Sequence, residues 1–241
     1  MRGFRPGLWP TLAALAVVAA TVLLGNWQHG RASYKASLQS QAFKAASEPA
    51  IELSSASAIA AAMRYRQVVA GGSYAADHQI WLDNRTHKGT SGYYVLTPLQ
   101  LADGSHVLVN RGWIAAAKYR DIVPAAAPAP GVVRVQGRLN APPPSFLALS
   151  NAPAAGAVWQ NLDLAEYSRV HGIAVAPLVI EQTLTPADGL IRDWPLPDFG
   201  RDTNISYMWQ WYSFAAVAAM FWIVLGFRAA CPRSSEKNRG K

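Results

Sequence analysis

The sequence predicts a membrane protein in which two transmembrane helices flank a mainly antiparallel β domain, either a small barrel or a curved sheet with one or two helices. Two observations lead to this fold class. Uncharged apolar runs lie near both ends of the 241-residue chain, and short β-branched or aromatic runs separated by turn residues fill the part between them. The expected organisation is a cytoplasmic tail (1–7), a first transmembrane helix (8–27), an extracytoplasmic β-rich domain (28–206), a second transmembrane helix (207–227) and a basic cytoplasmic tail (228–241).

Both apolar runs are long enough to cross a bilayer as helices, because a hydrocarbon core of about 30 Å needs about 20 helical residues. Tryptophans that favour the headgroup zone stand at the ends of these runs, with Trp9 and Trp27 around the first and Trp209 at the start of the second. A cleaved signal peptide ending at Ala20 is the alternative for the first run. We expect an uncleaved span, because the apolar residues continue to Leu24.

The charge distribution predicts the orientation in the membrane. Most of the formal net charge of +8 comes from the two tails, which hold seven Lys and Arg residues and one acid and so carry +6. Basic residues next to a span tend to stay cytoplasmic, so we expect both termini in the cytoplasm and residues 28–206 to be exported. Only +2 remains for the region between the tails, which argues against a nucleic-acid partner and for the lipid bilayer as the basic tails' neighbour.

The region between the spans begins with helices and continues with strands. Residues 28–44 suit a helix that continues from the first span, and residues 54–65 suit a short helix with Ser54 or Ser55 as N-cap. A further helix is expected over 163–171, capped by Asp163 and Gly172. The predicted strands are 66–74, 79–84, 93–101, 106–111, 132–139 and 176–184. Asp103-Gly104 predicts a hairpin that joins 92–101 to 105–113.

The sequence contains none of the nucleotide-binding or hydrolase motifs that glycine-rich loops, nucleophile elbows or HExxH zinc sites would show. The single cysteine, Cys231, lies in the C-terminal tail, so thiol and disulfide chemistry is not expected in the central domain. The five histidines lack the spacing of a helical metal site. We therefore expect a protein that is not an enzyme, with a membrane-tethered enzyme built on Asp83, Arg85, His87 and Arg111 as the weaker alternative.

Polar and tryptophan side chains gather at the ends of two predicted strands, within 82–89 and 109–113, and in a third cluster, 192–195, shortly before the second span. The candidate partner-binding residues are Asp83, Asn84, Arg85, Asn110, Arg111, Trp113, Arg192, Asp193 and Trp194. One interpretation is structural: the Asp and Asn residues satisfy turn backbone and the arginines pair with nearby acids. The other is that Arg85, Arg111 and Arg192 converge on carboxylates of a ligand or partner, which the planar guanidinium fork suits.

The same segments carry a family resemblance over nearly the whole chain. In chain order they are GNWQxxRxxxK (25–35), GSY (72–74), LDNRTHKGTSGYYVLTPL (82–99), DGSHVLVNRGW (103–113), WxNLD (159–163), RDWPLPDFG (192–200) and YxxQWY (207–212). This combination resembles the surfeit-locus family of cytochrome c oxidase assembly factors. The resemblance implies a two-span hairpin around an exported domain, residence in the bacterial inner membrane and help with haem a delivery to the catalytic subunit. It also implies oxidase subunits and a haem a synthesising enzyme as partners, and no catalytic turnover.

The chain departs from the family pattern at one position. Some bacterial members of the family bind haem a through a histidine near the outer end of the second span, and the corresponding position here is Asn204. Asparagine is a poor haem-iron ligand compared with imidazole. His29, at a similar membrane depth on the first span, is the substitute ligand that the sequence offers, with an interfacial histidine in contact with water as the alternative. A scaffold that binds oxidase subunits without a cofactor is therefore the second candidate function.

Overall fold

The computed structural model describes residues 4–118, 122–144, 156–184, 186–194 and 198–229. The chain divides into two compact units, a helical hairpin (1–40 and 197–241) and a β domain (41–196). Cys231, most of the basic C-terminal tail and the centre of the segment 192–200 lie outside the described residues.

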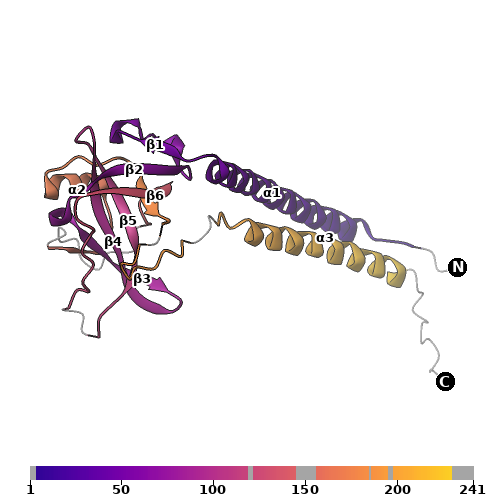
Figure 1. Ribbon diagram of the computed structural model, residues 1–241. Coiled ribbons are helices and arrows are strands. Elements are labelled where there is room, and N and C mark those ends of the chain that lie inside the picture. The colour runs from indigo at the N-terminus through magenta and orange to yellow at the C-terminus, as the bar shows by residue number, and fades with distance from the viewer. Residues whose placement is uncertain (1–3, 119–121, 145–155, 185, 195–197, 230–241) are drawn as a thin grey trace, which may run out of the picture. The chain divides into compact units, whose positions relative to one another are not determined.

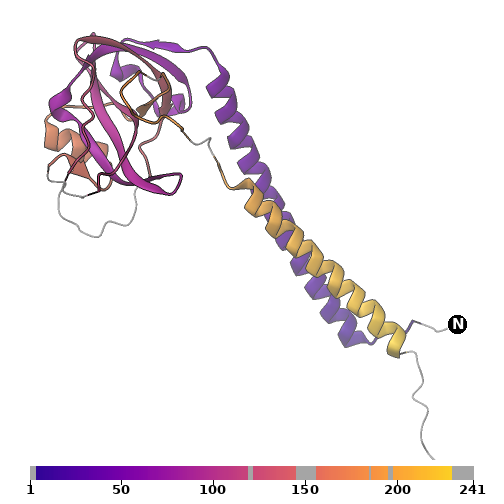
Figure 2. The same ribbon diagram turned by 60° about the horizontal axis from the view of Figure 1, so that its bottom comes forward.

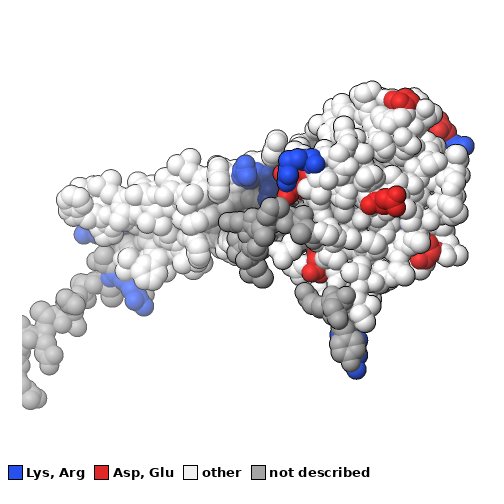
Figure 3. Space-filling view, turned by 90° about the vertical axis from the view of Figure 1, so that its left-hand side faces the viewer, with Lys and Arg blue, Asp and Glu red and all other residues white. Residues whose placement is uncertain are grey.

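The helical hairpin consists of α1 (Leu8–Ser47) and α3 (Arg201–Ala229), which run side by side in both ribbon views (Figures 1 and 2). Within the part of the chain that the structure describes, these two helices are long and apolar enough to cross a membrane. Only 11% of the most apolar window of each helix is buried, so neither is the core helix of a soluble domain. The space-filling view shows the middle of the hairpin almost without charged side chains (Figure 3).

The predicted helix 28–44 is confirmed as the continuation of the first apolar run. The helix α1 passes through Gly30 without a break and ends at Ser47. Neutral polar pairs join α1 to α3, with Trp222 Nε1 donating to Thr11 Oγ1 at 3.0 Å and Tyr212 donating to Asn26 Oδ1 at 2.7 Å. Hydrogen bonds of this kind fix the register of two helices when lipid covers their outer faces.

The β domain is a barrel, the first of the two predicted alternatives. Its strands are β1 (Ile51–Leu53), β2 (Gln67–Tyr74), β3 (Ile80–His87), β4 (Thr90–Leu101), β5 (His106–Ala115), β6 (Val132–Asn140), β7 (Val158–Trp159) and β8 (Val179–Gln182). The sheet order is β1-β2-β6-β8-β5-β4-β3-β7, and an additional pairing of β2 with β4 closes a ring of five strands. All pairings within this ring are antiparallel except β5 with β8.

A glycine makes the closure possible. Gly72 in β2 pairs with Val133 of β6 on one side and with Leu101 of β4 on the other. A Cβ atom at this position would lie 2.1 Å from the backbone oxygen of Gln100. The two neighbouring strands can therefore approach β2 closely only where it has no side chain.

Apolar side chains fill the inside of the barrel and the space under one helix. The barrel cluster includes Val68, Leu99, Val109, Leu139 and Ile180, all at or near zero exposure. A second cluster forms where α2 (Leu164–His171) packs through Tyr167 against Trp159 and Ile80. The predicted caps of α2 are confirmed: Asp163 Oδ1 accepts hydrogen bonds from two backbone N–H groups, and Gly172 adopts the left-handed conformation at φ 68°.

The predicted helix over 54–65 is wrong. The segment forms two 3-10 turns, η1 (Ala56–Ala58) and η2 (Ala61–Met63), separated by Ile59 in an extended conformation. Ile59 is only 4% exposed and belongs to the barrel cluster, so burial of this side chain interrupts the helix that local propensity favours. Ser55 caps η1 by accepting a hydrogen bond from Ser57 N.

Candidate functional site

The polar residues predicted at strand ends lie inside the strands, at two β-bulges. The ladder between β3 and β4 shifts between Leu82 and Arg85, so Asp83 and Asn84 together oppose one residue of β4. Asn84 adopts φ 59°, and Asp83 Oδ1 accepts a hydrogen bond from Asn84 N at 2.6 Å. These two side chains therefore shape the bulge, as the structural interpretation of the sequence expected.

The second bulge lies at Arg111 in β5. Gly112 of β5 pairs with Val95 of β4 while Asn110 pairs with Leu96, which leaves Arg111 as the extra residue. At Gly112 φ is 147°, and a Cβ atom there would lie 2.8 Å from Leu190 Cβ. The bulge therefore lets the segment 188–194 approach β5, where Trp113 and Ile191 exchange two backbone hydrogen bonds.

The side chain of Arg111 is only 2% exposed, and its hydrogen bonds stay within the β domain. Its guanidinium donates to Gln79 Oε1 at 3.1 Å, to the backbone oxygens of Ala126 and Ala127 at 2.7 and 3.1 Å, and to Asp188 Oδ2 at 3.4 Å. It also lies 5.5 Å from the centre of the Tyr74 ring. This guanidinium ties β5 to the proline-rich connector 124–130 and to the segment that leads toward α3.

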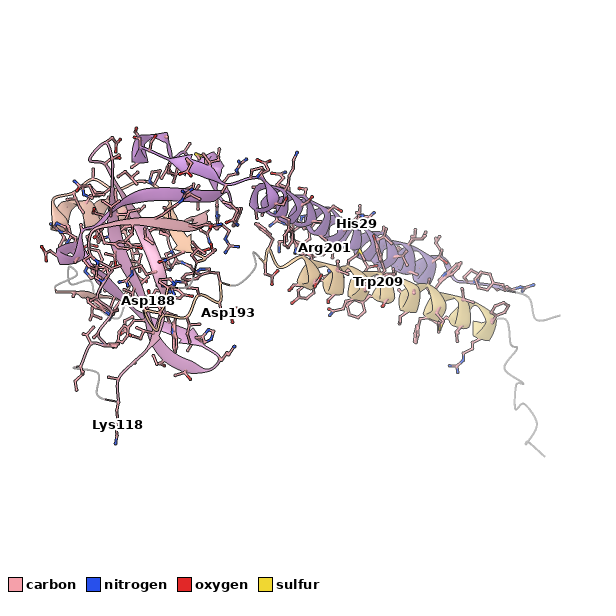
Figure 4. The ribbon with its side chains drawn as sticks, viewed as in Figure 1. His29, Lys118, Asp188, Asp193, Arg201 and Trp209 are labelled. Atoms are coloured by element: carbon pink, nitrogen blue, oxygen red, sulfur yellow. The ribbon has the colours of Figure 1, made fainter. Side chains whose placement is uncertain are left out.

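Asp188 is shared by two buried arginines. Arg192 Nη2 donates to Asp188 Oδ2 at 2.5 Å, and its side chain is also 2% exposed. Burial alone would raise the pKa of Asp188, but the hydrogen bonds from Arg192 and Leu190 N and the charges of both arginines together lower it. Figure 4 shows Asp188 within the β domain. Arg111 and Arg192 thus share one acid of the β domain, Asp188.

Arg85 on β3 is buried at 5% exposure. Its Nη1 donates to the backbone oxygen of Pro144 at 3.3 Å, and its guanidinium lies 5.9 Å from the centre of the Tyr94 ring. Burial lowers the pKa of Arg85, with Tyr94 and Asp83 acting in the opposite direction. Its backbone oxygen accepts a hydrogen bond from Trp113 Nε1 at 2.8 Å, which joins the first two polar clusters.

Each of the three polar segments contributes to the lining of one cavity of about 310 Å³, but the predicted residues Asp83, Asn84, Arg85, Asn110, Arg111 and Arg192 do not line it. We call it the aromatic pocket; Thr86, His87, Lys88, Tyr94, Trp113, Ile191, Asp193 and Trp194 line it. The rings inside it are close, with His87 5.2 Å from Trp113 and Tyr94 5.5 Å from Trp194 between ring centres. Lys88 and Asp193 form an exposed ion pair at 3.8 Å on its rim. The structure therefore brings together the predicted residues Trp113, Asp193 and Trp194, and adds Tyr94 from β4.

Arg111 and Asp188 also line a larger cavity of about 480 Å³. Tyr74, Arg111, Arg134, Gln182 and Asp188 contribute its polar lining, with Val133 and Val135 among its apolar walls. Burial raises the pKa of Tyr74 to about 12, against the opposing charges of Arg111 and Arg192, so the hydroxyl stays protonated at neutral pH. Sequence reasoning did not find this cavity, because its residues come from four separate strands and loops.

The helical hairpin places the predicted haem-ligand positions on different faces. Asn204 Nδ2 donates to Gln28 Oε1 at 2.6 Å, so this pair faces the partner helix, whereas His29 next to Gln28 is exposed (Figure 4). Lys35 Nζ donates to the backbone oxygen of Gly200 at 3.2 Å just beyond them. The described residues of the hairpin contain one histidine, His29.

A histidine pair that no sequence pattern indicated lies at the C-terminal end of α2. His78 Nδ1 and His171 Nδ1 are 3.3 Å apart, and the Tyr167 hydroxyl donates to the backbone oxygen of His78 at 2.5 Å. Burial, and then the charge of His78, lowers the pKa of His171. These histidines are 93 residues apart in the chain, so no local spacing could have revealed the pair. Within the described ranges, no group of three or more metal-ligating side chains is present.

Comparison with known proteins places the chain in a family. Residues 15–216 match the model of the SURF1 family. The chain is 29% identical over 245 residues to a SURF1-like protein of Monosiga brevicollis, with 92% of each chain covered. It is 27% identical over 214 residues to a SURF1-like protein of the bacterium Rickettsia bellii, covering 85% of this chain and 86% of that one. A SURF1-like protein of Dictyostelium discoideum is 38% identical over 101 residues. The chain therefore belongs to the SURF1 family, the surfeit-locus family whose motifs its sequence resembles.

Proposed function

We propose that this chain is a non-enzymatic assembly factor for cytochrome c oxidase, anchored by its helical hairpin in the bacterial inner membrane with both termini in the cytoplasm. In this role the β domain lies in the periplasm and assists insertion of haem a by holding the unfinished catalytic subunit in a receptive state. The observation that carries the proposal is the convergence of three family segments, around 86–88, 113 and 191–194, on the aromatic pocket.

The aromatic pocket suits a protein partner. Lys88 and Asp193 are exposed, oppositely charged side chains on the pocket rim, and such charges orient a partner without contributing much affinity. Aromatic side chains supply most of the binding energy of protein interfaces. The buried charges behind the pocket are held by Asp188 and backbone oxygens. The Arg111 network therefore acts as the frame that positions Trp113, and the pocket in front of it is the contact surface.

The residues of the hairpin do not fit a haem-iron site at Asn204. Its amide already donates to Gln28, and an amide oxygen is a poor iron ligand compared with imidazole. We therefore assign the assisting role to contacts with the subunit. The hairpin geometry therefore favours a scaffold that binds oxidase subunits without a cofactor. In this role the haem a is inserted into the catalytic subunit and is not held by this chain.

The decisive experiment deletes the gene from its bacterium and measures oxidase activity and the haem a absorption of membranes after complementation. We expect loss of both signals, rescue by the wild-type chain, and little rescue by Asp193→Ala combined with His87→Ala. The matched control is Asp77→Ala, which removes another exposed acid of the β domain outside the pocket. The pocket variant must accumulate to the wild-type level, as judged by immunoblotting of membranes. Normal oxidase maturation with this variant would refute the pocket, and normal maturation in the deletion strain would refute the assembly role.

A second candidate, direct haem a binding through His29, has its own test. His29 is exposed on α1 and is the histidine that the described hairpin offers. The protein is purified from cells that make haem a, and its Soret absorption and haem content are compared with those of His29→Ala. Haem that co-purifies with the wild-type chain and is lost from the variant would favour ligation. Protein without haem that still rescues the deletion strain would favour the scaffold.

A further inference from the structure

The helical hairpin carries an apolar groove near its terminal end. The groove has a volume of about 410 Å³ and lies between the two helices, with Ala13, Ala14 and Val17 on α1 and Phe214, Ala218 and Trp222 on α3 among its walls. A smaller cavity of about 150 Å³ shares Ala14 and Trp222 with it. The groove exists because small side chains on α1 face large rings on α3.

The polar atom nearest to the groove is already satisfied. Trp222 Nε1 donates to Thr11 Oγ1 at 3.0 Å, and Thr11 Oγ1 in turn donates to the backbone oxygen of Gly7 at 2.8 Å. The groove therefore offers an occupant apolar contact and no hydrogen bond. In a bilayer such a hollow is filled by hydrocarbon, either from a lipid chain or from a partner helix.

Charge at one end of the groove distinguishes these occupants. On α3 the groove residues Phe214, Ala218, Phe221 and Leu225 recur every three or four positions, and Arg228 continues this stripe one turn later. Arg228 is exposed, and the stretch 214–229 contains no acid.

A second arginine is held at the same end. Arg5 N donates to the backbone oxygen of Gly226 at 3.2 Å, and the Phe4 ring packs 5.0 Å from Trp222 and 5.4 Å from Phe227 between ring centres. These contacts fix the exposed N-terminal segment at the end of α3, next to a wall of the groove. Residues 4–17 also contain no acid, so the two guanidinium groups have no carboxylate within either stretch.

We propose that this groove binds one acyl chain of an anionic phospholipid whose phosphate is held by Arg5 and Arg228. The guanidinium fork matches phosphate oxygens. The arginines lie beyond one end of the groove, as the headgroup of a lipid lies beyond one end of its acyl chain. A partner helix would fill the groove without needing both cations at its end. This site is independent of the proposed assembly function and of the orientation of the chain in the membrane.

The test uses the full chain in a mild detergent and titrates it with phosphatidylglycerol or phosphatidylcholine, with bound lipid counted by native mass spectrometry. We expect preferential retention of phosphatidylglycerol by the wild-type chain. Arg228→Gln should weaken its binding about fivefold, which corresponds to about 1 kcal/mol for one basic residue near an anionic headgroup. Ala14→Phe, which fills the groove, should lower retention of the lipid further. Val17→Phe at the groove wall is the second filling variant, should Ala14→Phe fail to fold as judged by circular dichroism.

Two matched controls make the outcome decisive. Arg201→Gln removes a cation from the other end of α3, and Ala19→Phe adds the same ring on the exposed face of α1 opposite the groove. Neither control should change retention of phosphatidylglycerol. If Arg201→Gln and Arg228→Gln lower the retention of phosphatidylglycerol equally, the lipid is held by general electrostatic attraction and the proposal is overturned. Unchanged retention in both groove-filling variants, or equal binding of the two lipids, would also overturn it and leave the groove to a partner helix.

Discussion

The β domain and the helical hairpin use polar side chains in opposite ways. The β domain buries charge: the side chains of Arg111 and Arg192 are each 2% exposed and share Asp188. The hairpin joins its helices through single hydrogen bonds between neutral groups, such as Asn204 with Gln28. A buried ion that loses its partner is very costly, whereas hydrogen bonds between membrane helices contribute little each. The difference implies that the β domain fails abruptly when its network is cut and that the hairpin weakens in small steps.

The largest effect is expected for Asp188→Ala. This change leaves two buried guanidinium groups without their shared carboxylate, and breaking such a pair commonly costs about 3–5 kcal/mol. Denaturant unfolding of the full chain in detergent, followed by tryptophan fluorescence, measures the loss. Asp193→Ala, an exposed acid of the same segment, is the control and should lose less than about 0.5 kcal/mol. Similar small losses in both variants would show that the network adds no stability.

A comparison of two glycines should give the next largest difference. A Cβ atom at Gly137 in the barrel would lie 2.4 Å from the backbone oxygen of Glu181, whereas one at Gly25 in the hairpin would meet the ring of Tyr212. Backbone cannot move aside as a ring can, so we expect Gly137→Ala to cost about 1–3 kcal/mol by overpacking. Gly25→Ala should cost less than Gly137→Ala, through displacement of Tyr212 from Asn26. Unfolding of the β domain and of the hairpin in the same samples measures the two stability losses. A larger loss of stability in Gly25→Ala than in Gly137→Ala would contradict the prediction.

Acid should destabilise the β domain through its histidine pair. Burial, followed by the charge of His78, lowers the pKa values of His171 and His106, so the unfolded chain binds protons at a higher pH than the folded domain does. This contribution to stability is complete above the ordinary histidine pKa of 6.5 and falls as the pH drops below it. Urea midpoints should therefore be lower at about pH 5.5 than at about pH 7.5, and His171→Gln should reduce that difference. An unchanged pH dependence in this variant, with His87→Gln as control, would contradict the assignment.

The smallest effect is expected in the hairpin. Asn204→Leu removes the hydrogen bond to Gln28, and bonds of this kind between membrane helices average about 0.6 kcal/mol. Unfolding of the helices by a denaturing detergent, followed by circular dichroism, measures the loss. A loss as large as that of Asp188→Ala would remove the contrast between the two units.

Local sequence signals predicted much of the fold. Asp103-Gly104 identified the β4–β5 hairpin, and Asp163 and Gly172 identified both ends of α2, because turns and caps depend on a few neighbouring residues. The short strands β1 and β7 were missed, since each pairs in parallel with a distant strand and has little pattern of its own. The helix over 54–65 was wrongly predicted because burial of Ile59 is a long-range effect.

The candidate site was predicted in part for the same reason. The sequence suggested that Arg85, Arg111 and Arg192 converge on a ligand or partner, whereas the aromatic pocket is lined by Trp113, Asp193 and Trp194 of the same three clusters. The predicted positions of Asp83, Asn84 and Arg111 at strand ends were wrong, because a β-bulge is a mismatch between two strands and cannot be read from either strand alone. Asp188 was missed as the partner of Arg111, which is 77 residues away in the chain.

Barrel closure also sets the order in which the domain can mature. The strand β8 fills the place between β5 and β6, so the ring stays open until the ribosome has produced the chain through Gln182. Contacts so distant in sequence form slowly, because a long loop must close before any of them is gained. Only residues 183–200 then separate the completed barrel from the start of α3 at Arg201. The strand that completes the barrel is therefore synthesised only shortly before the last helix.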